Sequence, residues 1–273
     1  MINIVYSNTS YLDILNIQSD YISKFSEKTL FINKSEIEMD EIYSKYDRVI
    51  FYDDSKEYSA RLIECLSQLD CDYITFMHDI DILIEMDEEK MTSFYSFMRE
   101  RGIDRIDLKY TKDIEGHELI RVDSKSPKEW VESEYVEVGG LYLVKQTNPE
   151  GNANLFNVNP SIWKRDSLLG MLNNFPNKTY RSIEELDVQA YCSNMQIYKI
   201  HCDKPLQCGY FECTPPFVYL HITHGGRLLL LDGRNVTEYG QSYSDLAQEY
   251  VKIAERYNLR NSSKSASNNT WRI

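Results

Sequence analysis

The chain has 273 residues, of which 42% are hydrophobic, and this is enough apolar surface to bury a substantial core and to exclude a disordered protein. Its 30 basic and 43 acidic residues give a formal net charge of −13, which argues against nucleic acid or an anionic membrane as a partner. An anionic substrate would therefore need a local cation.

The segment Met1–Tyr6 begins directly as a strand and lacks the basic start and long apolar run of a secretory signal. No later segment is apolar for long enough to predict a membrane span. The six cysteines form no Cys-x-x-Cys pair, which argues against structural zinc and for reduced thiols. We therefore expect a cytoplasmic protein with no transmembrane segment, and its oligomeric state stays open.

Strand and helix patterns alternate through the first half of the chain. Strands are predicted at Asn3–Tyr6, Thr29–Ile32 and Arg48–Tyr52, with apolar helical patterns over residues 12–25 and 62–69. Alternation of this kind is typical of βαβ units. It predicts an α/β fold with a mostly parallel sheet.

Two carboxylates, Asp79 and Asp81, interrupt the strand-forming run Tyr73–Ile84. Acidic groups at the carboxyl end of a buried strand lie where open α/β sheets bind ligands. Mg²⁺ and Mn²⁺ take oxygen ligands, usually one or two carboxylates together with substrate phosphates, so we hypothesise a metal-bound nucleotide diphosphate. Alternatively, the two aspartates cap the helix that is predicted to follow Met86.

The parallel rhythm ends after that helix, which is predicted to stop near Gly102. Beyond it the elements are a mixture of strands and helices in a smaller, less regular β region, with a turn at residues 139–140. Strands are predicted at Ile103–Tyr110, Leu119–Val122, Leu141–Lys145, Gln196–His201 and Phe217–Thr223, and helices at Ser161–Leu172, Ile183–Cys192 and Tyr243–Tyr257. We expect one domain over residues 1–260 and a flexible tail over residues 261–273.

Several short motifs occur in a characteristic order. They are Tyr58-x-x-Arg61, Asp79-x-Asp81, Pro160-x-x-Trp163-Lys164-Arg165, the acidic helix start at Glu184 and Glu185, and His221-x-x-His224-Gly225. In this order the chain resembles glycosyltransferases of the GT-A fold, particularly viral and bacterial ones that build surface glycans or capsules. The resemblance implies a Rossmann-like sheet flanked by helices.

The resemblance also implies a metal site. Asp79 and Asp81 would form the metal motif, with Asp81 the direct ligand and Asp79 in contact with ribose or a metal-bound water. His224 would be a third ligand or a diphosphate contact, since neutral imidazole is a reasonable ligand for Mn²⁺. Alternatively, His224 is an ordinary turn residue beside glycine.

A carboxylate must accept the proton of the acceptor hydroxyl if the transfer inverts the anomeric centre. The candidates are Glu185, which the resemblance favours by position, then Glu184 and Asp187. The alternative is that these acids only favour the macrodipole in the first turn of a helix.

Donor-binding residues are also implied by the resemblance. Ser7 and Asn8 follow the first strand, where the nucleotide base would lie, and Asp53 follows the third. Arg61 would contact the donor or brace the Asp-x-Asp loop. Trp163 would wall the sugar pocket, or else is a buried core residue.

Together these features predict a metal-dependent glycosyltransferase that uses Mn²⁺ or Mg²⁺ and a nucleotide-sugar donor, with a UDP-sugar as the default. It would act on a hydroxyl of a glycan acceptor, by single displacement. One alternative is a sugar-phosphate nucleotidyltransferase, although the glycine-rich loop normal in that class is missing from Tyr6–Ser10. Another is a non-catalytic glycan- or nucleotide-binding protein of the same fold.

Overall fold

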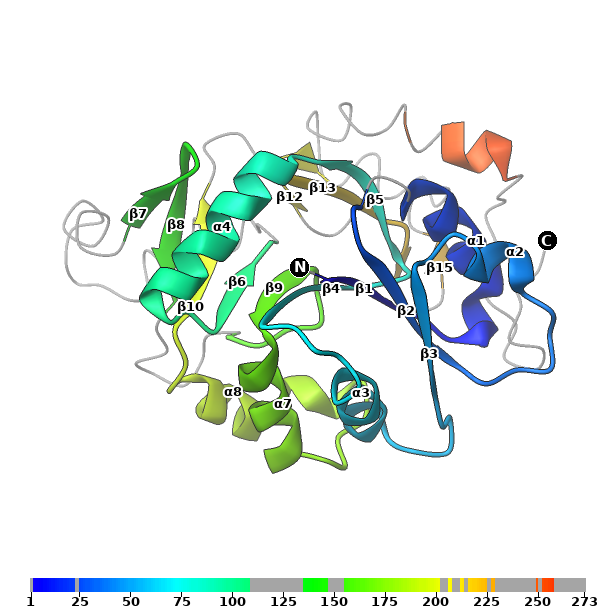
Figure 1. The fold of residues 1–273 in the computed structure, drawn as a ribbon, viewed down its shortest axis with the longest axis horizontal. Coiled ribbons are helices and arrows are strands. Elements are labelled where there is room, and N and C mark those ends of the chain that lie inside the picture. Colours follow the sequence, from blue (N-terminus) through cyan, green and yellow to red (C-terminus); the bar gives the residue numbers. More distant parts are fainter. Residues whose placement is uncertain are drawn as a thin grey trace.

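The computed structural model describes residues 2–22, 25–108, 135–146, 155–201, 206–207, 212–213, 216–224, 227–228, 249 and 252–257. A central nine-stranded sheet forms the middle layer, with helices on both of its faces (Figure 1). Its strand order is β3-β2-β1-β4-β9-β6-β10-β8-β7. None of the helices in these ranges is both long enough and apolar enough to cross a membrane.

The first half of the sheet is parallel, as the sequence predicts. Its strands are β1 (Ile2–Tyr6), β2 (Lys28–Asn33), β3 (Arg48–Tyr52) and β4 (Tyr73–His78). Each pairs in parallel with its neighbour, with β1 between β2 and β4. The connecting helices are η1 (Thr9–Tyr11), α1 (Leu12–Tyr21), α2 (Asp40–Tyr43) and α3 (Tyr58–Leu66). The carboxyl ends of β1, β3 and β4 therefore lie on one edge of the sheet.

The second half of the sheet is mixed. It contains β6 (Arg105–Asp107), β7 (Tyr135–Val138), β8 (Leu141–Lys145), β9 (Ser161–Lys164) and β10 (Ile197–His201). Of the nine strands, β8 and β9 run against the others. The predicted α/β class with a mostly parallel sheet and a less regular β region is thus confirmed. The predicted turn is also confirmed, since Gly139 and Gly140 adopt φ values of 60° and 76°.

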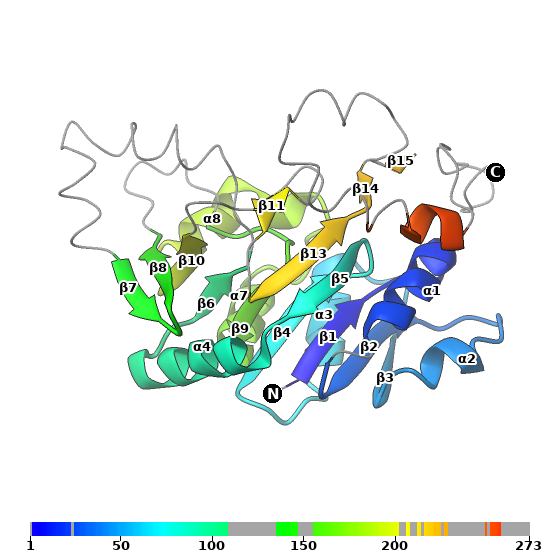
Figure 2. The same ribbon diagram turned by 90° about the horizontal axis from the view of Figure 1, so that it is seen from above.

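A small second sheet begins immediately after the carboxylate pair. Here β5 (Asp81–Met86) leaves the direction of β4 and pairs antiparallel with β13 (Phe217–His221). The remaining short strands are β11 (Leu206–Gln207), β12 (Glu212–Cys213), β14 (Thr223–His224) and β15 (Arg227–Leu228). Figure 2 shows β13 and β5 side by side, in front of the main sheet.

Helix α4 (Glu88–Arg101) follows β5 and has clear end signals. The side chain of Asp87 accepts a hydrogen bond from Lys90 N at 3.1 Å, and Gly102 ends the helix in the left-handed conformation at φ 67°. Asp87, rather than Asp79 or Asp81, therefore caps this helix. The capping alternative for the carboxylate pair is wrong.

The helix predicted at residues 161–172 begins later than expected. Residues 161–164 form β9, which pairs with β4 on one side and β6 on the other, and α7 (Arg165–Asn174) follows. Two strand partners satisfy the backbone of this short apolar run, and this outweighs its helical pattern. Residues 183–192 divide into η4 (Ser182–Glu184) and α8 (Leu186–Cys192). The strand predicted at residues 119–122 lies outside the described residues.

The sheet separates two hydrophobic cores. Helices α3, α7 and α8 cover one face, where Leu62, Met171 and Val188 are buried. Helices α1 and α4, together with the β5–β13 pair, cover the other face, where Leu15 and Phe94 are buried. Because both faces are covered, the central strands β1 and β4 are almost entirely buried.

The C-terminal helical residues 252–256 pack onto α1, and Ile253 is fully buried there. Asp20 at the end of α1 is the polar anchor of this contact. It accepts hydrogen bonds from Lys45, from Tyr257 and from Arg256, the last at 2.9 Å. Burial alone would raise the pKa of Asp20, but these hydrogen bonds and cationic charges hold that pKa below its ordinary value.

Replacing Asp20 with Asn should lower the free energy of unfolding at neutral pH by on the order of 1–2 kcal/mol, because it removes a charge-assisted contact to three side chains. A carboxylate whose folded pKa is depressed stabilises the protein above its unfolded pKa of about 3.9. The difference in the free energy of unfolding between Asp20→Asn and wild type should therefore shrink as the pH falls below about 4.

Urea unfolding between pH 7 and pH 3 measures this difference. The exposed Asp70 supplies the control, since Asp70→Asn should leave the unfolding curve nearly unchanged. A destabilisation by Asp20→Asn that is the same at every pH would exclude the electrostatic explanation.

Candidate functional site

The two predicted carboxylates lie between β4 and β5, with Asp79 directly after β4 and Asp81 at the first position of β5, and they are 4% and 2% exposed. The backbone amide of Asp79 donates to Tyr6 O at 3.0 Å, and Ser7 Oγ donates to Asp79 Oδ2. The carboxylate of Asp79 is therefore held at the carboxyl end of β1. Burial of two acids here is costly unless they are paired or bind a cation.

The carboxyl ends of β1 and β3 are joined by polar contacts. Tyr52 OH donates to Ser7 O at 2.7 Å, and Asn8 Nδ2 donates to Asp54 Oδ1 at 3.1 Å. Asp53 is exposed and accepts hydrogen bonds from the backbone amide and hydroxyl of Ser55, which together form a turn. The structure thus brings Ser7, Asn8 and Asp79 together and leaves Asp53 on the adjacent loop.

Arg61 braces this loop. Its guanidinium lies 2.8 Å from Asp54 Oδ1, donates to Lys56 O at 2.6 Å and sits 5.3 Å above the ring of Tyr52. The carboxylate partner of Arg61 is therefore Asp54, and not one of the Asp-x-Asp pair.

In the second sheet, His221 on β13 contacts Asp81 on the neighbouring strand β5. The two residues are partners in the β5–β13 register, and His221 Nδ1 lies 2.7 Å from Asp81 Oδ1. Their side chains are 6% and 3% exposed, so the contact is buried. The sequence pattern favours His224 instead. That residue lies in β14, and the structure does not describe its side chain. The strand pairing that brings His221 to Asp81 joins residues 140 positions apart, so no local sequence pattern indicates this contact.

His78 precedes the pair and is a structural histidine. Its Nδ1 lies 2.8 Å from Val158 O, and its Nε2 lies 2.9 Å from Tyr58 OH. A carbonyl only accepts, so Nδ1 carries the proton and Nε2 accepts from the phenol. Burial lowers the pKa of His78 to about 4, which keeps the ring neutral at physiological pH.

The segment Leu155–Pro160 forms a wall beside this turn, and buried side chains satisfy its backbone. Arg105 is fully buried and donates to Leu155 O at 2.7 Å and to Asn157 Oδ1 at 2.8 Å. Gln189 donates to Phe156 O and accepts from Phe156 N, at 2.8 and 2.9 Å. The wall is thus fixed from β6 and α8.

The three candidate bases lie in two different environments. Glu184 Oε1 accepts from Val158 N at 2.8 Å, so its exposed carboxylate is held against the wall segment. Glu185 and Asp187 instead share Lys178 Nζ, at 2.9 and 2.8 Å, and both are largely exposed. The same Val158 that contacts Glu184 also contacts His78, which adjoins Asp79. Glu184 is therefore linked to the carboxylate pair through Val158 and His78.

Trp163 is 1% exposed and belongs to the core. Its Nε1 donates to Ser161 Oγ at 3.0 Å, and the Arg105 guanidinium lies 5.0 Å from its ring centroid. This placement matches the buried-core alternative for Trp163 rather than a wall of a sugar pocket. An exposed aromatic residue near the turn is Tyr180, which sequence reasoning did not distinguish among 21 tyrosines.

A divalent cation fits the chemistry of the pair. The described part of the chain contains no group of three or more His, Cys, Asp or Glu side chains placed to hold a metal ion. Two carboxylates nevertheless suit Mg²⁺ or Mn²⁺ when substrate phosphates and water complete the shell. Asp79 and Asp81 are the residues that would hold it.

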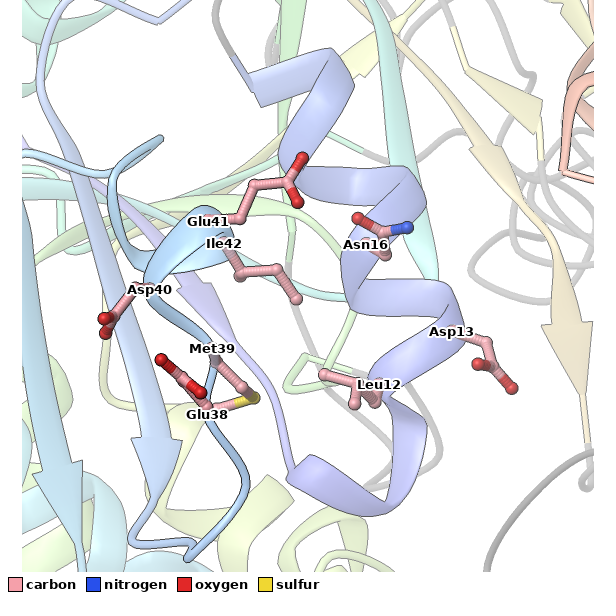
Figure 3. Close-up of a pocket in the computed structure, with 8 residues that line it drawn as sticks. All are labelled: Leu12, Asp13, Asn16, Glu38, Met39, Asp40, Glu41 and Ile42. Atoms are coloured by element: carbon pink, nitrogen blue, oxygen red, sulfur yellow. The ribbon is translucent and has the colours of Figure 1, made fainter.

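A recess of about 510 Å³ opens elsewhere, between α1 and α2 (Figure 3). None of the predicted site residues lines it. Its lining residues are Leu12, Asp13, Asn16, Glu38, Met39, Asp40, Glu41 and Ile42.

Comparisons with known proteins give distant structural similarities. No protein-family model matches the sequence, and no curated protein sequence is significantly similar to it. TarS of S. aureus superposes with a TM-score of 0.45 at 13% identity, over 78% of this chain and 60% of TarS 1–349. The chain thus spans less than two thirds of that protein's length.

Two nucleotide-handling enzymes are similar at the same level. Apo UDP-glucose pyrophosphorylase has a TM-score of 0.42 at 10% identity, over 78% of this chain and 92% of that one. A cytidylyltransferase from Leptospira borgpetersenii has a TM-score of 0.44 at 8% identity, over 92% and 95% of the two chains. At this level of similarity, function is inferred from the residues of this chain alone.

The wall segment provides a test of the site's scaffold. Arg105→Lys should lower the free energy of unfolding by about 3 kcal/mol, because a lysine ammonium cannot reproduce the forked contacts of a buried guanidinium. Arg99→Lys, on the exposed face of α4, is the matched control and should be nearly neutral. Denaturant unfolding that gives the same stability for both variants would contradict the anchoring role of Arg105.

Proposed function

We propose that this chain is a metal-dependent glycosyltransferase, which moves a sugar from a nucleotide-sugar donor to a hydroxyl of a glycan acceptor. The observation that carries the proposal is the buried pair Asp79 and Asp81 at the carboxyl edge of the parallel half-sheet. One carboxylate is tied to β1 through Ser7 and the other to β13 through His221. Pre-oriented carboxylates at such an edge suit a cation and a diphosphate.

The donor nucleotide would lie over the carboxyl ends of β1 and β3. Ser7, Asn8 and Asp53 supply hydroxyl, amide and carboxylate groups there. Arg61 would act indirectly, because it fixes the β3–α3 loop through Asp54 and Lys56. His221 would act as a positioning residue, since ligating carboxylates are commonly oriented by a second hydrogen-bonded group.

Glu184 is the base we favour over Glu185 and Asp187. It is exposed and fixed to the wall segment next to the carboxylate pair, whereas the other two acids are paired with Lys178. A base must reach the acceptor proton before its basicity matters. The ion pairs of Glu185 and Asp187 orient them toward Lys178.

The transfer would proceed by single displacement. Glu184 takes the proton of the acceptor hydroxyl while that oxygen forms a bond to the anomeric carbon, and the bond from that carbon to the diphosphate oxygen breaks. The configuration at the anomeric carbon is inverted. A cation bound by Asp79 and Asp81 would stabilise the charge that develops on the departing diphosphate.

Asp81→Asn should abolish metal-dependent donor binding and leave the fold intact, because amide and carboxylate have nearly the same shape. Thermal denaturation with UDP, GDP, CDP and dTDP sugars, each with and without Mn²⁺, measures binding as a rise in the midpoint. Wild type should respond to one nucleotide class only when Mn²⁺ is present, and Asp81→Asn to none.

Asp70→Asn should behave like wild type in the same panel. Absence of any shift with the wild-type protein would favour a non-catalytic binding protein. Release of pyrophosphate when the protein is given a nucleoside triphosphate and a sugar phosphate would instead identify a nucleotidyltransferase.

Glu184→Gln should reduce turnover by about a hundredfold or more, the usual contribution of a general base, with little change in donor affinity. Glu185→Gln should retain most of the activity, since Glu185 is paired with Lys178. Donor-dependent release of nucleoside diphosphate measures both variants. If Glu185→Gln is the inactive one, Glu185 is the base and the assignment of Glu184 is wrong.

A further inference from the structure

Tyr180 is an exposed aromatic residue beside the candidate site. It lies in the loop between α7 and η4 and is 43% exposed. The other exposed large hydrophobic residues in the described part of the chain are Ile37, Phe51 and Leu186. Exposure of a large aromatic ring costs free energy, so a ring that is exposed next to a site is a candidate for ligand contact.

Two buried aromatic residues hold Tyr180 in place. Its ring centroid lies 5.4 Å from that of Tyr58 and 5.3 Å from that of His78, and the ring planes are nearly perpendicular in both pairs. Tyr58 and His78 are themselves joined by a hydrogen bond. The exposed ring of Tyr180 is therefore supported by a rigid base, and this lowers the entropy cost of binding a ligand against it.

The same contacts place Tyr180 next to the carboxylates. His78 directly precedes Asp79 in the chain, and its Val158 partner is also the partner of Glu184. The Tyr180 ring is only partly exposed, so partial burial, and then the charges of Asp81, Glu184 and Asp79, raise the pKa of its phenol. The phenol is therefore neutral at physiological pH and can donate a hydrogen bond.

The position of Tyr180 suits contact with the transferred sugar. In the proposed reaction, the transferred sugar lies between the diphosphate, held at Asp79 and Asp81, and the base at Glu184. Tyr180 packs on His78, which precedes Asp79 and shares Val158 with Glu184, whereas Trp163 is buried and faces Arg105. An aromatic ring packs well against the apolar face of a pyranose, and a phenol hydrogen bonds to its hydroxyls.

We propose that Tyr180 is the residue that contacts the transferred sugar, with its ring against the apolar face of the pyranose and its hydroxyl bonded to a sugar oxygen. This inference rests on the proposed function, because it requires a nucleotide-sugar donor. It predicts that Tyr180 contributes to the affinity for the sugar and contributes nothing to the affinity for the bare nucleotide.

The test compares three bare nucleotides with their sugar conjugates: UDP with UDP-glucose, GDP with GDP-glucose, and dTDP with dTDP-glucose. Calorimetric titration in the presence of Mn²⁺ gives the Kd for each. Tyr180→Ala should weaken conjugate binding by about threefold to tenfold, as expected for one lost aromatic contact, and should leave bare-nucleotide binding unchanged. Tyr191→Ala removes a partly buried aromatic residue on α8 that packs edge-to-face on Phe175, and it should change neither affinity.

Tyr180→Phe separates the two contacts. It keeps the ring and the packing on Tyr58 and His78, so it should lose only the hydroxyl contribution, about threefold in conjugate affinity. This variant also tests the inference if Tyr180→Ala does not fold.

Each contrary outcome identifies what is wrong. If wild type binds none of the six compounds and no nucleotide sugar of the UDP, GDP, CDP and dTDP panel shifts its thermal midpoint, the proposed function fails. If wild type binds but the Tyr180 variants bind conjugates as tightly as wild type, or lose equal affinity for conjugate and bare nucleotide, Tyr180 does not contact the sugar.

Discussion

The arrangement of the two sheets depends on Asp79–Asp81, where the chain leaves β4 of the main sheet and enters β5 of the second sheet. Up to Asp79 the chain belongs to the main sheet, and from Asp81 onward it belongs to the pair with β13. The buried contact of Asp81 with His221 joins the N-terminal half to a segment 140 residues later. A carboxylate buried at such a junction is tolerated because it is paired, and pairing fixes its direction. The same constraint that builds the fold therefore orients a candidate ligand group.

A second constraint acts on the wall segment Leu155–Pro160, whose backbone is satisfied mainly by side chains. Arg105, His78 and Gln189 come from three separate elements and each contacts this segment. Unpaired backbone groups in a buried segment are expensive, so these contacts determine where it lies. Since Glu184 contacts the same segment, core packing and the position of the favoured base are coupled.

The parallel half-sheet and the carboxylate pair were predictable from the sequence, because both depend on local patterns of strand, helix and turn residues. β9 was not, because a four-residue apolar run has no decisive period and its strand partners, β4 and β6, are distant in sequence. The contact of His221 with Asp81 depends on strand register, which a single sequence does not reveal. The sequence also gives no sign of Tyr180, because its place beside the carboxylate pair comes from ring contacts with His78 and Tyr58, which are distant in sequence.

The ion pairs around the site explain why a bound diphosphate would need a cation. Arg61 and Lys178 are basic residues near it, and each is already paired with carboxylates: Arg61 with Asp54, and Lys178 with Glu185 and Asp187. In a chain with a net charge of −13, these pairs offset acidic neighbours rather than present positive charge to a ligand. A diphosphate bound beside Asp79 and Asp81 would meet two further negative groups. A divalent cation between them converts that repulsion into attraction, and the acidic pair then becomes the reason that the anion binds.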